Sequence, residues 1–302
     1  MTGNAVTVLV ATRNRPNDLR RCLQSILVSS YPSFRLMVVD QSDNDDALRA
    51  CAAITDGRLE YVRDRGTGLS RARNVGIGAI TSGIIAMTDD DCVVATDWLE
   101  RLVALFRDNA ECMLAFGNFV AAPHDWRREF IPSAVFDRPA THSGRHYRFL
   151  DHGCGGNMAA RRELFTQLGG FDERLGAGAQ FHAGEDHDMK YRACAAGLTT
   201  MAIPSARVEH WGARSLLNGD AQRLQRHTQI GRGARAAQAL RCGDFGAAPA
   251  FAKDLGRCFL SGARNLRVHG RPTGAARIPY ALWGFARGMF APLDKALCVF
   301  IA

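Results

Sequence analysis

The chain has 302 residues, of which 47% are hydrophobic and 23% charged, and it carries a formal net charge of +8 at pH 7. This composition excludes disordered, collagen-like and low-complexity chains, and the length allows one large or two modest domains. The basic balance suits an anionic partner, such as a nucleotide diphosphate, a nucleic acid or an acidic membrane. It decides nothing alone, because a GC-rich genome also favours arginine.

Nine cysteines are scattered along the chain, and no two of them are closer than sixteen residues. This spacing excludes zinc ribbons, iron–sulfur runs and thioredoxin-like motifs, so we expect buried thiols in a reducing compartment. Residues 1–4 lack the basic flank of a signal peptide, and no uncharged stretch reaches the length of a transmembrane helix. The expected location is therefore the cytoplasm.

Short apolar runs alternate with helical patterns through the first 120 residues. Residues 6–11 have the β-branched composition of a strand buried on both faces, and residues 18–29 show apolar side chains at helical spacing. The alternation continues through predicted strands at 34–39, 59–62, 84–87 and 113–119 and predicted helices at 45–54, 71–80 and 97–107. This order predicts an open α/β sheet, which binds ligands at the carboxyl ends of its strands.

The pattern changes after residue 122. Residues 123–152 are rich in Arg, His, Pro and aromatic residues, which predicts a long loop. Predicted helices at 161–168 and 184–196 and predicted strands at 201–203 and 207–211 follow that loop. Beyond Gly212 the composition shifts to helices rich in Arg, Ala and Gln. We therefore place a boundary there, between residues 1–212 and 213–302.

Three carboxylates, Asp89, Asp90 and Asp91, follow the predicted strand at 84–87. Adjacent carboxylates repel one another, so a cation or several donors must offset their charge. Side chains two residues apart on an extended segment point the same way, so Asp89 and Asp91 can share one divalent ion. Such hard oxygen ligands suit Mg²⁺ or Mn²⁺, and the structural alternative is a solvated acidic turn.

Other polar residues stand at the ends of predicted elements. Glu185 and Asp186 begin a predicted helix, where a carboxylate serves either as a cap or as a general base. Asp40 ends the second predicted strand, and Arg71 opens a helix after a glycine-rich loop, a place suited to phosphate. His210 lies near the end of the last predicted strand, before Trp211, and a lone histidine is more often structural than a ligand.

The order of these segments resembles the family 2 glycosyltransferases, inverting enzymes of the GT-A fold. The stretches that carry the resemblance are VTVLVATRNRPNDLRRCLQSIL, LMVVDQSD, GLSRARNVGIGAI, MTDDDCVVATDWLERL, GCGGNMAARRELFTQLGGFDERL, GEDHDMKYRACAAG and IPSARVEHWG. They span residues 6–212, about two thirds of the chain. The resemblance implies a Rossmann-like, open, mostly parallel sheet flanked by helices. It divides residues 1–212 into a nucleotide-sugar half, about 1–120, and an acceptor half, about 121–212, before a C-terminal helical extension.

The resemblance also implies a role for each matching position. The donor would meet Ala11, Thr12, Arg13, Asp40, Arg71, Asp89 and Asp90; the metal would meet Asp89, Asp91 and His210; the sugar and acceptor side would include Asn157, Glu185 and Trp211. Asp186 falls where the family has its catalytic base. Arg13 stands where many relatives carry an aromatic residue that stacks on the base, which leaves the nucleotide open, with UDP favoured.

The activity that the resemblance implies is inverting sugar transfer from a nucleotide diphosphate to a hydroxyl, in cell-surface polysaccharide or glycolipid synthesis. Bound Mn²⁺ or Mg²⁺ would offset the charge of the leaving diphosphate, and Asp186 would take the hydroxyl proton. We expect the adjacent Glu185 to raise the pKa of Asp186 toward neutrality. A raised pKa suits a base that works near pH 7.

Three other functions fit the residues less well. A nucleotidyltransferase should carry a glycine-rich signature after the first strand, and residues 12–16 contain no glycine. A dehydrogenase fingerprint needs a third glycine after Gly76 and Gly78, which also fall inside a predicted helix. A nucleic-acid partner is not expected, because helix-turn-helix, RNP-type and zinc signatures are absent from the sequence.

The C-terminal region leaves three alternatives open. Residues 223–241 are strongly basic, and residues 278–301 are apolar and rich in aromatic side chains, interrupted by Arg287 and Pro292. The pair suits an interfacial segment on an anionic membrane, at the inner face of the cytoplasmic membrane if the acceptor is a lipid-linked sugar. It equally suits helices packed on the catalytic region, or the contact of a homodimer.

Overall fold

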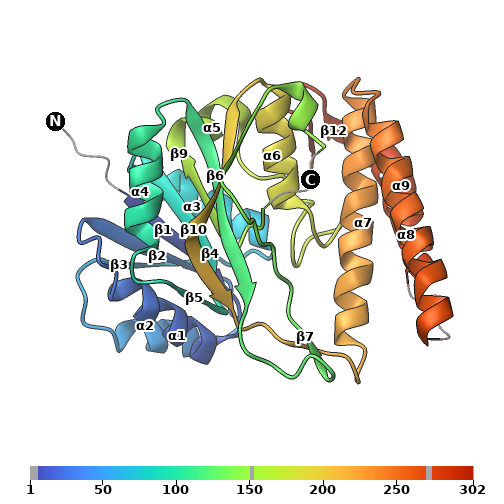
Figure 1. The fold of residues 1–302 in the computed structure, drawn as a ribbon. Coiled ribbons are helices and arrows are strands. Elements are labelled where there is room, and N and C mark those ends of the chain that lie inside the picture. The colour runs from blue at the N-terminus through green and yellow to red at the C-terminus, as the bar shows by residue number, and fades with distance from the viewer. Residues whose placement is uncertain (1–5, 150–152, 270–273, 302) are drawn as a thin grey trace.

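A nine-stranded sheet forms the centre of the molecule in this computed structural model, which describes residues 6–149, 153–269 and 274–301 (Figure 1). The strand order is β3-β2-β1-β4-β9-β6-β10-β5, and β8 pairs with β10. The strands of this sheet are β1 (Val6–Thr12), β2 (Phe34–Asp40), β3 (Leu59–Arg63), β4 (Ile84–Asp89), β5 (Cys92–Val94), β6 (Cys112–Ala121), β8 (Ala140–Ser143), β9 (Asn157–Arg161) and β10 (Thr199–His210). Two small antiparallel sheets pair β7 (Glu129–Phe130) with β11 (Arg214–Ser215) and β12 (Leu293–Asp294) with β13 (Val299–Phe300).

Parallel pairing dominates the half of the sheet built from the first ninety residues. β1 pairs in parallel with β2 and β4, and β2 with β3, while β6 and β10 form a second parallel pair. β9 runs antiparallel between β4 and β6 and joins the two halves. The predicted open, mostly parallel sheet is therefore confirmed, and the reversed strands β9, β5 and β8 are additions to it.

Helices cover both faces of the sheet, which explains why its strands are apolar without alternation. The helices are α1 (Pro16–Leu27), α2 (Asp46–Ala52), α3 (Leu69–Ala79), α4 (Trp98–Asp108), α5 (Arg162–Leu168), α6 (Glu185–Ala195), α7 (Asp220–Arg241), α8 (Ala247–His269) and α9 (Ile278–Phe290). Successive side chains of β1 enter different cores, because they point to opposite faces. Val8 belongs to one core cluster with Leu23 of α1 and Leu102 of α4, and Leu9 belongs to another with Leu164 of α5.

Two stretches differ from the predicted elements. The predicted loop at 123–152 contains β7, β8 and a 3₁₀ turn at Arg145–Tyr147, and its residues 150–152 lie outside the described part. The two predicted strands at 201–203 and 207–211 form one strand, β10, whose register against β6 shifts between Ile203 and Arg207. Pro204 lies within that shift, where a residue without an amide proton is tolerated.

The C-terminal helices pack against each other and against the catalytic region (Figure 1). α7 and α9 approach closely, because a Cβ at Gly233 would collide with the Ala281 carbonyl and a Cβ at Gly284 with that of Ile230. The Gln238 amide of α7 donates to Asp188 of α6, at 3.1 Å. Of the three alternatives for the C-terminal region, α7 follows the second: it packs on residues 6–212. An outer face of α8 and α9 remains exposed to solvent.

The cysteines depart from their predicted state at one pair. Cys242, which follows α7, and Cys298, which precedes β13, form a disulfide. The expectation of unpaired thiols is therefore wrong for these two, and it holds for the other seven cysteines. Spacing could not reveal the pair, because 56 residues separate the two positions and the fold alone brings them together.

Over the described ranges, no helix combines the length and the apolar character that crossing a bilayer requires. The residues judged against a signal peptide, 1–4, lie outside those ranges.

Candidate active site at the strand ends

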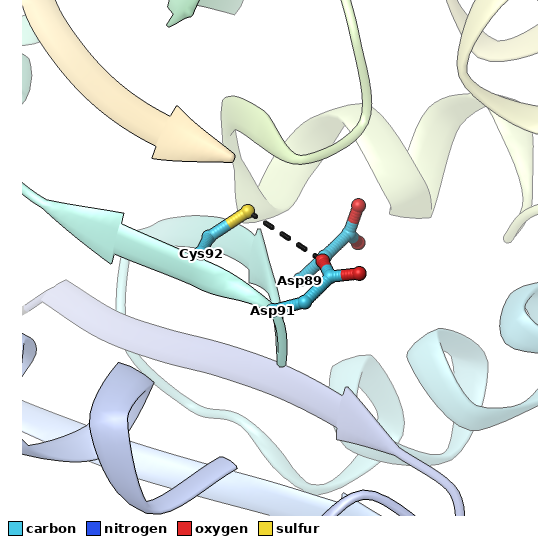
Figure 2. A group of neighbouring side chains, drawn as sticks. All are labelled: Asp89, Asp91 and Cys92. Carbon is cyan, nitrogen blue, oxygen red and sulfur yellow. Dashed lines mark hydrogen bonds between the residues drawn. The ribbon is translucent and has the colours of Figure 1, made fainter. Parts of the chain in front are cut away.

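A cavity of about 370 Å³ opens at the carboxyl ends of β1 and β4, where the sheet topology is expected to place ligands. Among its lining residues are seven of the predicted site residues: Ala11, Thr12, Arg13, Asp89, Asp90, Asp91 and His210. Figure 2 shows Asp89 and Asp91 close together, with Cys92 beside them. The fold thus gathers strand ends that lie up to 199 residues apart in the sequence.

Cationic and hydroxyl groups surround two of the three carboxylates. Arg15 lies 2.7 Å from Asp91 and 3.2 Å from Asp90, and the Thr12 hydroxyl donates to Asp90 at 2.8 Å. Burial raises the pKa of Asp90 to about 6, although Arg15 opposes the change. Burial acts in the same direction on Asp91, but His210 and Arg15 outweigh it and lower its pKa to about 2. Asp91 is therefore firmly ionised at neutral pH.

A buried arginine connects the third carboxylate to the predicted base region. Arg73 of α3 is 3% exposed and lies 3.0 Å from both Asp89 and Glu185. Burial raises the pKa of Glu185 to about 7, with the nearby charge of Asp186 adding to the effect. The Arg73 guanidinium thus holds two carboxylates from distant segments in one charge network.

The residues at this strand end fit a divalent cation. Oxygen atoms of Asp89 and Asp91 and the Cys92 sulfur all lie within 4.8 Å of one another. His210 holds its Nδ1 at 3.1 Å from the Pro132 carbonyl, which requires a proton on that nitrogen, and turns Nε2 toward Asp91. Gly212 keeps the space open, because a Cβ there would collide with Asp91 and His210.

Cys92 is the least suitable ligand of this group for Mg²⁺ or Mn²⁺. Burial raises the pKa of its thiol well above the usual value, so the sulfur stays protonated and donates to Asp91 (Figure 2). Hard cations prefer carboxylate oxygens, and imidazole also serves Mn²⁺. The donor set that fits is therefore Asp89, Asp91 and His210, as predicted from the resemblance.

Asp186 begins α6 with its carboxylate held in place. One oxygen accepts from the Gly155 amide at 2.8 Å, and the other accepts from the His187 amide at 2.7 Å. Burial raises the pKa of Asp186, but His187 and these amides outweigh it, so the pKa lies below its usual range. The expectation that Glu185 raises the pKa of Asp186 is therefore wrong: the raised pKa belongs to Glu185, where burial outweighs Arg73 and a backbone hydrogen bond.

Two of the predicted donor residues lie outside the cavity. Asp40 is fully buried and accepts from the Tyr61 hydroxyl at 2.7 Å, beneath a neighbouring cavity of about 420 Å³. Gln41 lines both cavities, so Asp40 lies next to the main one. Arg71 lines neither and pairs instead with Asp64, at 3.1 Å.

The predicted sugar and acceptor residues also lie apart from the cavity lining. Asn157 is fully buried, and its amide accepts from the Trp98 indole at 2.9 Å and donates to the Ala206 carbonyl. These bonds commit Asn157 to the core in this structure. Trp211 is 41% exposed, and the Arg21 guanidinium lies 4.9 Å from its ring centroid.

Further residues belong to the site without a role in the predicted site, among them Arg15, Arg73, Gly212, Arg214 and Leu224. Arg15 and Arg73 lie inside the sequence stretches that carry the family resemblance, which was a signal that they belong to the site. Their carboxylate partners could not be predicted from the sequence. Arg214 and Leu224 come from beyond the predicted boundary at residue 212. The division into 1–212 and 213–302 stays a prediction, and the C-terminal side contributes to the cavity wall.

Comparison with known proteins places the chain in a family. The family model described as "Glycosyl transferase family 2" matches residues 7–169, more than half of the chain. A glucosyl-dolichyl phosphate glucuronosyltransferase of Haloferax volcanii is 24% identical over 186 residues, which cover 59% of this chain and 58% of that protein. The chain spans less than two thirds of the length of the curated relatives it matches.

Solved structures match almost the whole chain. The mannosyltransferase PcManGT from Pyrobaculum calidifontis, solved with GDP-Man and Mn²⁺, has a TM-score of 0.62 at 18% identity, covering 94% of this chain and 87% of that one. Residues 1–349 of S. aureus TarS have a TM-score of 0.61 at 14% identity, covering 95% and 81%. At these identities the likeness shows the fold, which is the predicted GT-A fold with C-terminal helices. The chain belongs to glycosyl transferase family 2.

Proposed function

We propose that the chain is an inverting glycosyltransferase that moves a sugar from a nucleotide diphosphate to an acceptor hydroxyl. The observation that carries the proposal is the strand-end cavity, where Asp89 and Asp91 lie beside Arg15 and His210. A nucleotide diphosphate fits this mixture of a cation site and an arginine. The matched mannosyltransferase was solved with a nucleotide sugar and Mn²⁺, which supports the same ligand class here.

The departing diphosphate carries concentrated negative charge, and offsetting that charge is the largest expected contribution to catalysis. Arg15 and Arg214 line the cavity and supply fixed positive charge. Asp89, Asp91 and His210 would hold Mn²⁺ or Mg²⁺, which supplies Lewis-acid stabilisation of the phosphate oxygens when bound. Ala11, Thr12, Arg13 and Asp90 would surround the base and ribose at the strand ends, and the buried Asp40 would support them from the adjacent end of β2.

Asp186 is the proposed general base. Its carboxylate is ionised at neutral pH and held by the amides of Gly155 and His187, so it can accept the proton of a hydroxyl. Attack from the face opposite the diphosphate inverts the anomeric carbon. The Arg73 bridge from Asp89 to Glu185 supports the proposal, because it ties the donor carboxylates to the segment that carries the base.

UDP is the favoured nucleotide, and a sugar or lipid-linked sugar is the proposed acceptor. The Haloferax relative is named for a dolichyl phosphate sugar, which supports a role in polysaccharide or glycolipid synthesis. Arg13 lines the cavity and replaces the aromatic residue of many relatives, so GDP and dTDP need direct comparison.

A thermal-shift panel tests the donor and metal assignment. With UDP and Mn²⁺ at about 100 times Kd, we expect roughly 2.7 kcal/mol of stabilisation, or roughly 5–10 °C in Tm. The Asp91→Asn variant should lose most of the metal-dependent increase in Tm, because it removes a metal-binding carboxylate whose pKa is lowered to about 2. The same shift for every nucleotide with and without Mn²⁺ would contradict the proposed function.

Asp97→Asn is the matched control for that panel. Asp97 precedes α4 and pairs with Arg101 on the surface, with 40% of its side chain exposed. It makes the same chemical change away from the cavity and should keep the full shift. Equal shifts in Asp91→Asn and Asp97→Asn would remove Asp91 from the metal site.

We also propose that the exposed face of α8 and α9 rests on an anionic membrane surface, at the inner face of the cytoplasmic membrane. The exposed apolar side chains there are Phe259, Leu260, Leu282, Trp283, Met289 and Phe290. Residues 247–302 hold eight Lys and Arg against two Asp, a net charge of +6 out of the chain's +8. Apolar and basic residues together match the interface of an acidic bilayer better than they match an identical, equally basic copy.

Vesicle co-sedimentation tests this surface. The chain should bind vesicles that contain phosphatidylglycerol and leave pure phosphatidylcholine vesicles unbound. Phe290→Glu should weaken binding about tenfold or more, because Phe290 is 89% exposed and its ring would enter the interface. Val28→Glu, 65% exposed at the end of α1, is the matched control and should bind normally. If the wild-type chain does not bind vesicles but forms a dimer that Phe290→Glu abolishes, the exposed face of α8 and α9 instead contacts a second copy of the chain.

A further inference from the structure

A second cavity, of about 470 Å³, lies between α6, α7 and α8 and shares no lining residue with the strand-end cavity. Four basic residues line it, Arg232 and Arg235 from α7 and Lys253 and Arg257 from α8. The two carboxylates in its lining are Asp188 and Asp254. It is larger than the proposed donor cavity, and the proposed reaction does not use it.

The carboxylates in this cavity are already engaged. Asp188 accepts from Arg192 at 2.8 Å and from the Gln238 amide at 3.1 Å. Asp254 lies 3.3 Å from Arg257, its neighbour on α8. Asp188 is paired with an arginine outside the lining and Asp254 with Arg257. These two carboxylates therefore do not balance the charge of the other basic residues in the lining.

Arg235 and Lys253 carry this excess charge. The Arg235 guanidinium donates to the His187 carbonyl at 3.2 Å, and its Nε is buried without a hydrogen-bond partner in the described residues. Lys253 is exposed and pairs with no described carboxylate. Arg235 lines the cavity and is only half-buried, so its other guanidinium nitrogens and the Lys253 ammonium can donate to an anionic ligand there.

We propose that this cavity binds a phosphate-bearing ligand. Arginine side chains match the oxygens of a phosphate or diphosphate in paired hydrogen bonds, and a lysine adds a point charge. The rings of Phe149, Tyr191 and Phe251 form apolar walls in the same cavity, so the ligand has room for an organic part beside its phosphate. The inference goes beyond the proposed transfer reaction and does not depend on it.

Arg235 also places this ligand close to the proposed base. It donates to the carbonyl of His187, the residue whose amide holds the carboxylate of Asp186. A phosphate bound by Arg235 would therefore lie near the backbone of His187, the residue that follows Asp186 in α6. The phosphate has two sources, a phosphorylated lipid lying along α8 or a soluble phosphate compound.

Calorimetric titration with inorganic pyrophosphate tests the cavity. The titration includes EDTA, so that a divalent ion cannot bring pyrophosphate to the strand-end cavity. We expect one pyrophosphate per chain, bound at least tenfold more weakly by Lys253→Glu. No heat at millimolar pyrophosphate, or wild-type affinity in Lys253→Glu, would overturn the proposal.

Lys295→Glu is the matched control. Lys295 is another of the chain's three lysines and lines a different cavity, so the variant has the same total charge as Lys253→Glu. Its affinity for pyrophosphate should stay within twofold of the wild type. An equal loss in the two variants would mean that net charge alone attracts pyrophosphate, and would overturn the site. Asp91→Asn should bind pyrophosphate normally, which separates this test from that of the donor cavity.

Two further ligands distinguish the sources of the phosphate. Farnesyl phosphate and inorganic phosphate carry the same head group, and only the first carries an apolar chain. At least tenfold tighter binding of farnesyl phosphate assigns the cavity to a phosphorylated lipid. If farnesyl phosphate and inorganic phosphate bind with equal affinity, and Lys253→Glu weakens the binding of each, the cavity is assigned to soluble phosphate compounds.

Discussion

Asp186→Asn should lower kcat by about 10²–10⁴-fold while the Kd of the nucleotide diphosphate changes little. The asparagine keeps the size of the side chain and an oxygen for the Gly155 amide, but it cannot take a proton from the acceptor. Steady-state kinetics with the donor identified by the thermal-shift panel, together with nucleotide titration, measure the two effects separately. Full turnover in a variant that still binds donor would contradict the assignment of the base.

Glu185→Gln is the decisive comparison, because the two neighbouring carboxylates differ in pKa and in partners. Judged by pKa alone, Glu185, at about 7, would be the better base near neutral pH. Its side chain is nevertheless nearly buried and paired with Arg73, whereas Asp186 is held by backbone amides with more of its side chain exposed. We expect the smaller loss of kcat in Glu185→Gln, and the opposite order would transfer the role of base to Glu185.

Arg73→Met should destabilise the folded chain by about 3–5 kcal/mol, which lowers Tm on the order of 10 °C. The variant leaves Asp89 and Glu185 without the cation that lies 3.0 Å from each of them. Breaking a buried pair costs more than the pair contributes, because an uncompensated charge stays behind. Calorimetric or fluorescence unfolding measures the loss.

Arg71→Met is the matched control on the same helix. Arg71 pairs with Asp64 at 3.1 Å, but 44% of its side chain is exposed, so water replaces the partner at little cost. Its effect on stability should stay within about 1 kcal/mol. A similar loss of stability in both variants would show that the Arg73 bridge has no special importance.

The different partners of Arg71 and Arg73 could not be predicted from the sequence. Both stand at the start of α3, and the resemblance assigned the donor role to Arg71. Residues two apart on a helix point in nearly opposite directions, because each residue turns the helix by about 100°. Which of the two faces the carboxylates depends on how α3 packs on the sheet, and the structure directs Arg73 to them.

The partition of pKa between Glu185 and Asp186 has a similar origin. The two residues are adjacent in the sequence, and both were recognised as candidates for the catalytic segment. Asp186 meets the Gly155 amide, from a loop 31 residues earlier, whereas Glu185 turns into the protein toward Arg73. Only His187, whose charge lowers the pKa of Asp186 most, is a neighbour in the sequence; Gly155 and Arg73 come from other segments, so the sequence pattern could not predict which carboxylate stays ionised.

Three features could be predicted from the amino-acid sequence: the alternation of strands and helices, the open sheet, and the position of Asp89 and Asp91 at a strand end. These features depend on local periodicity and on strand order, which a single chain displays directly. The bridge through Arg73, the burial of Asn157, the Cys242–Cys298 disulfide and the second, basic cavity are evident only in the folded chain. Each of these depends on contacts between segments far apart in the chain, and such contacts leave no periodic pattern in the sequence.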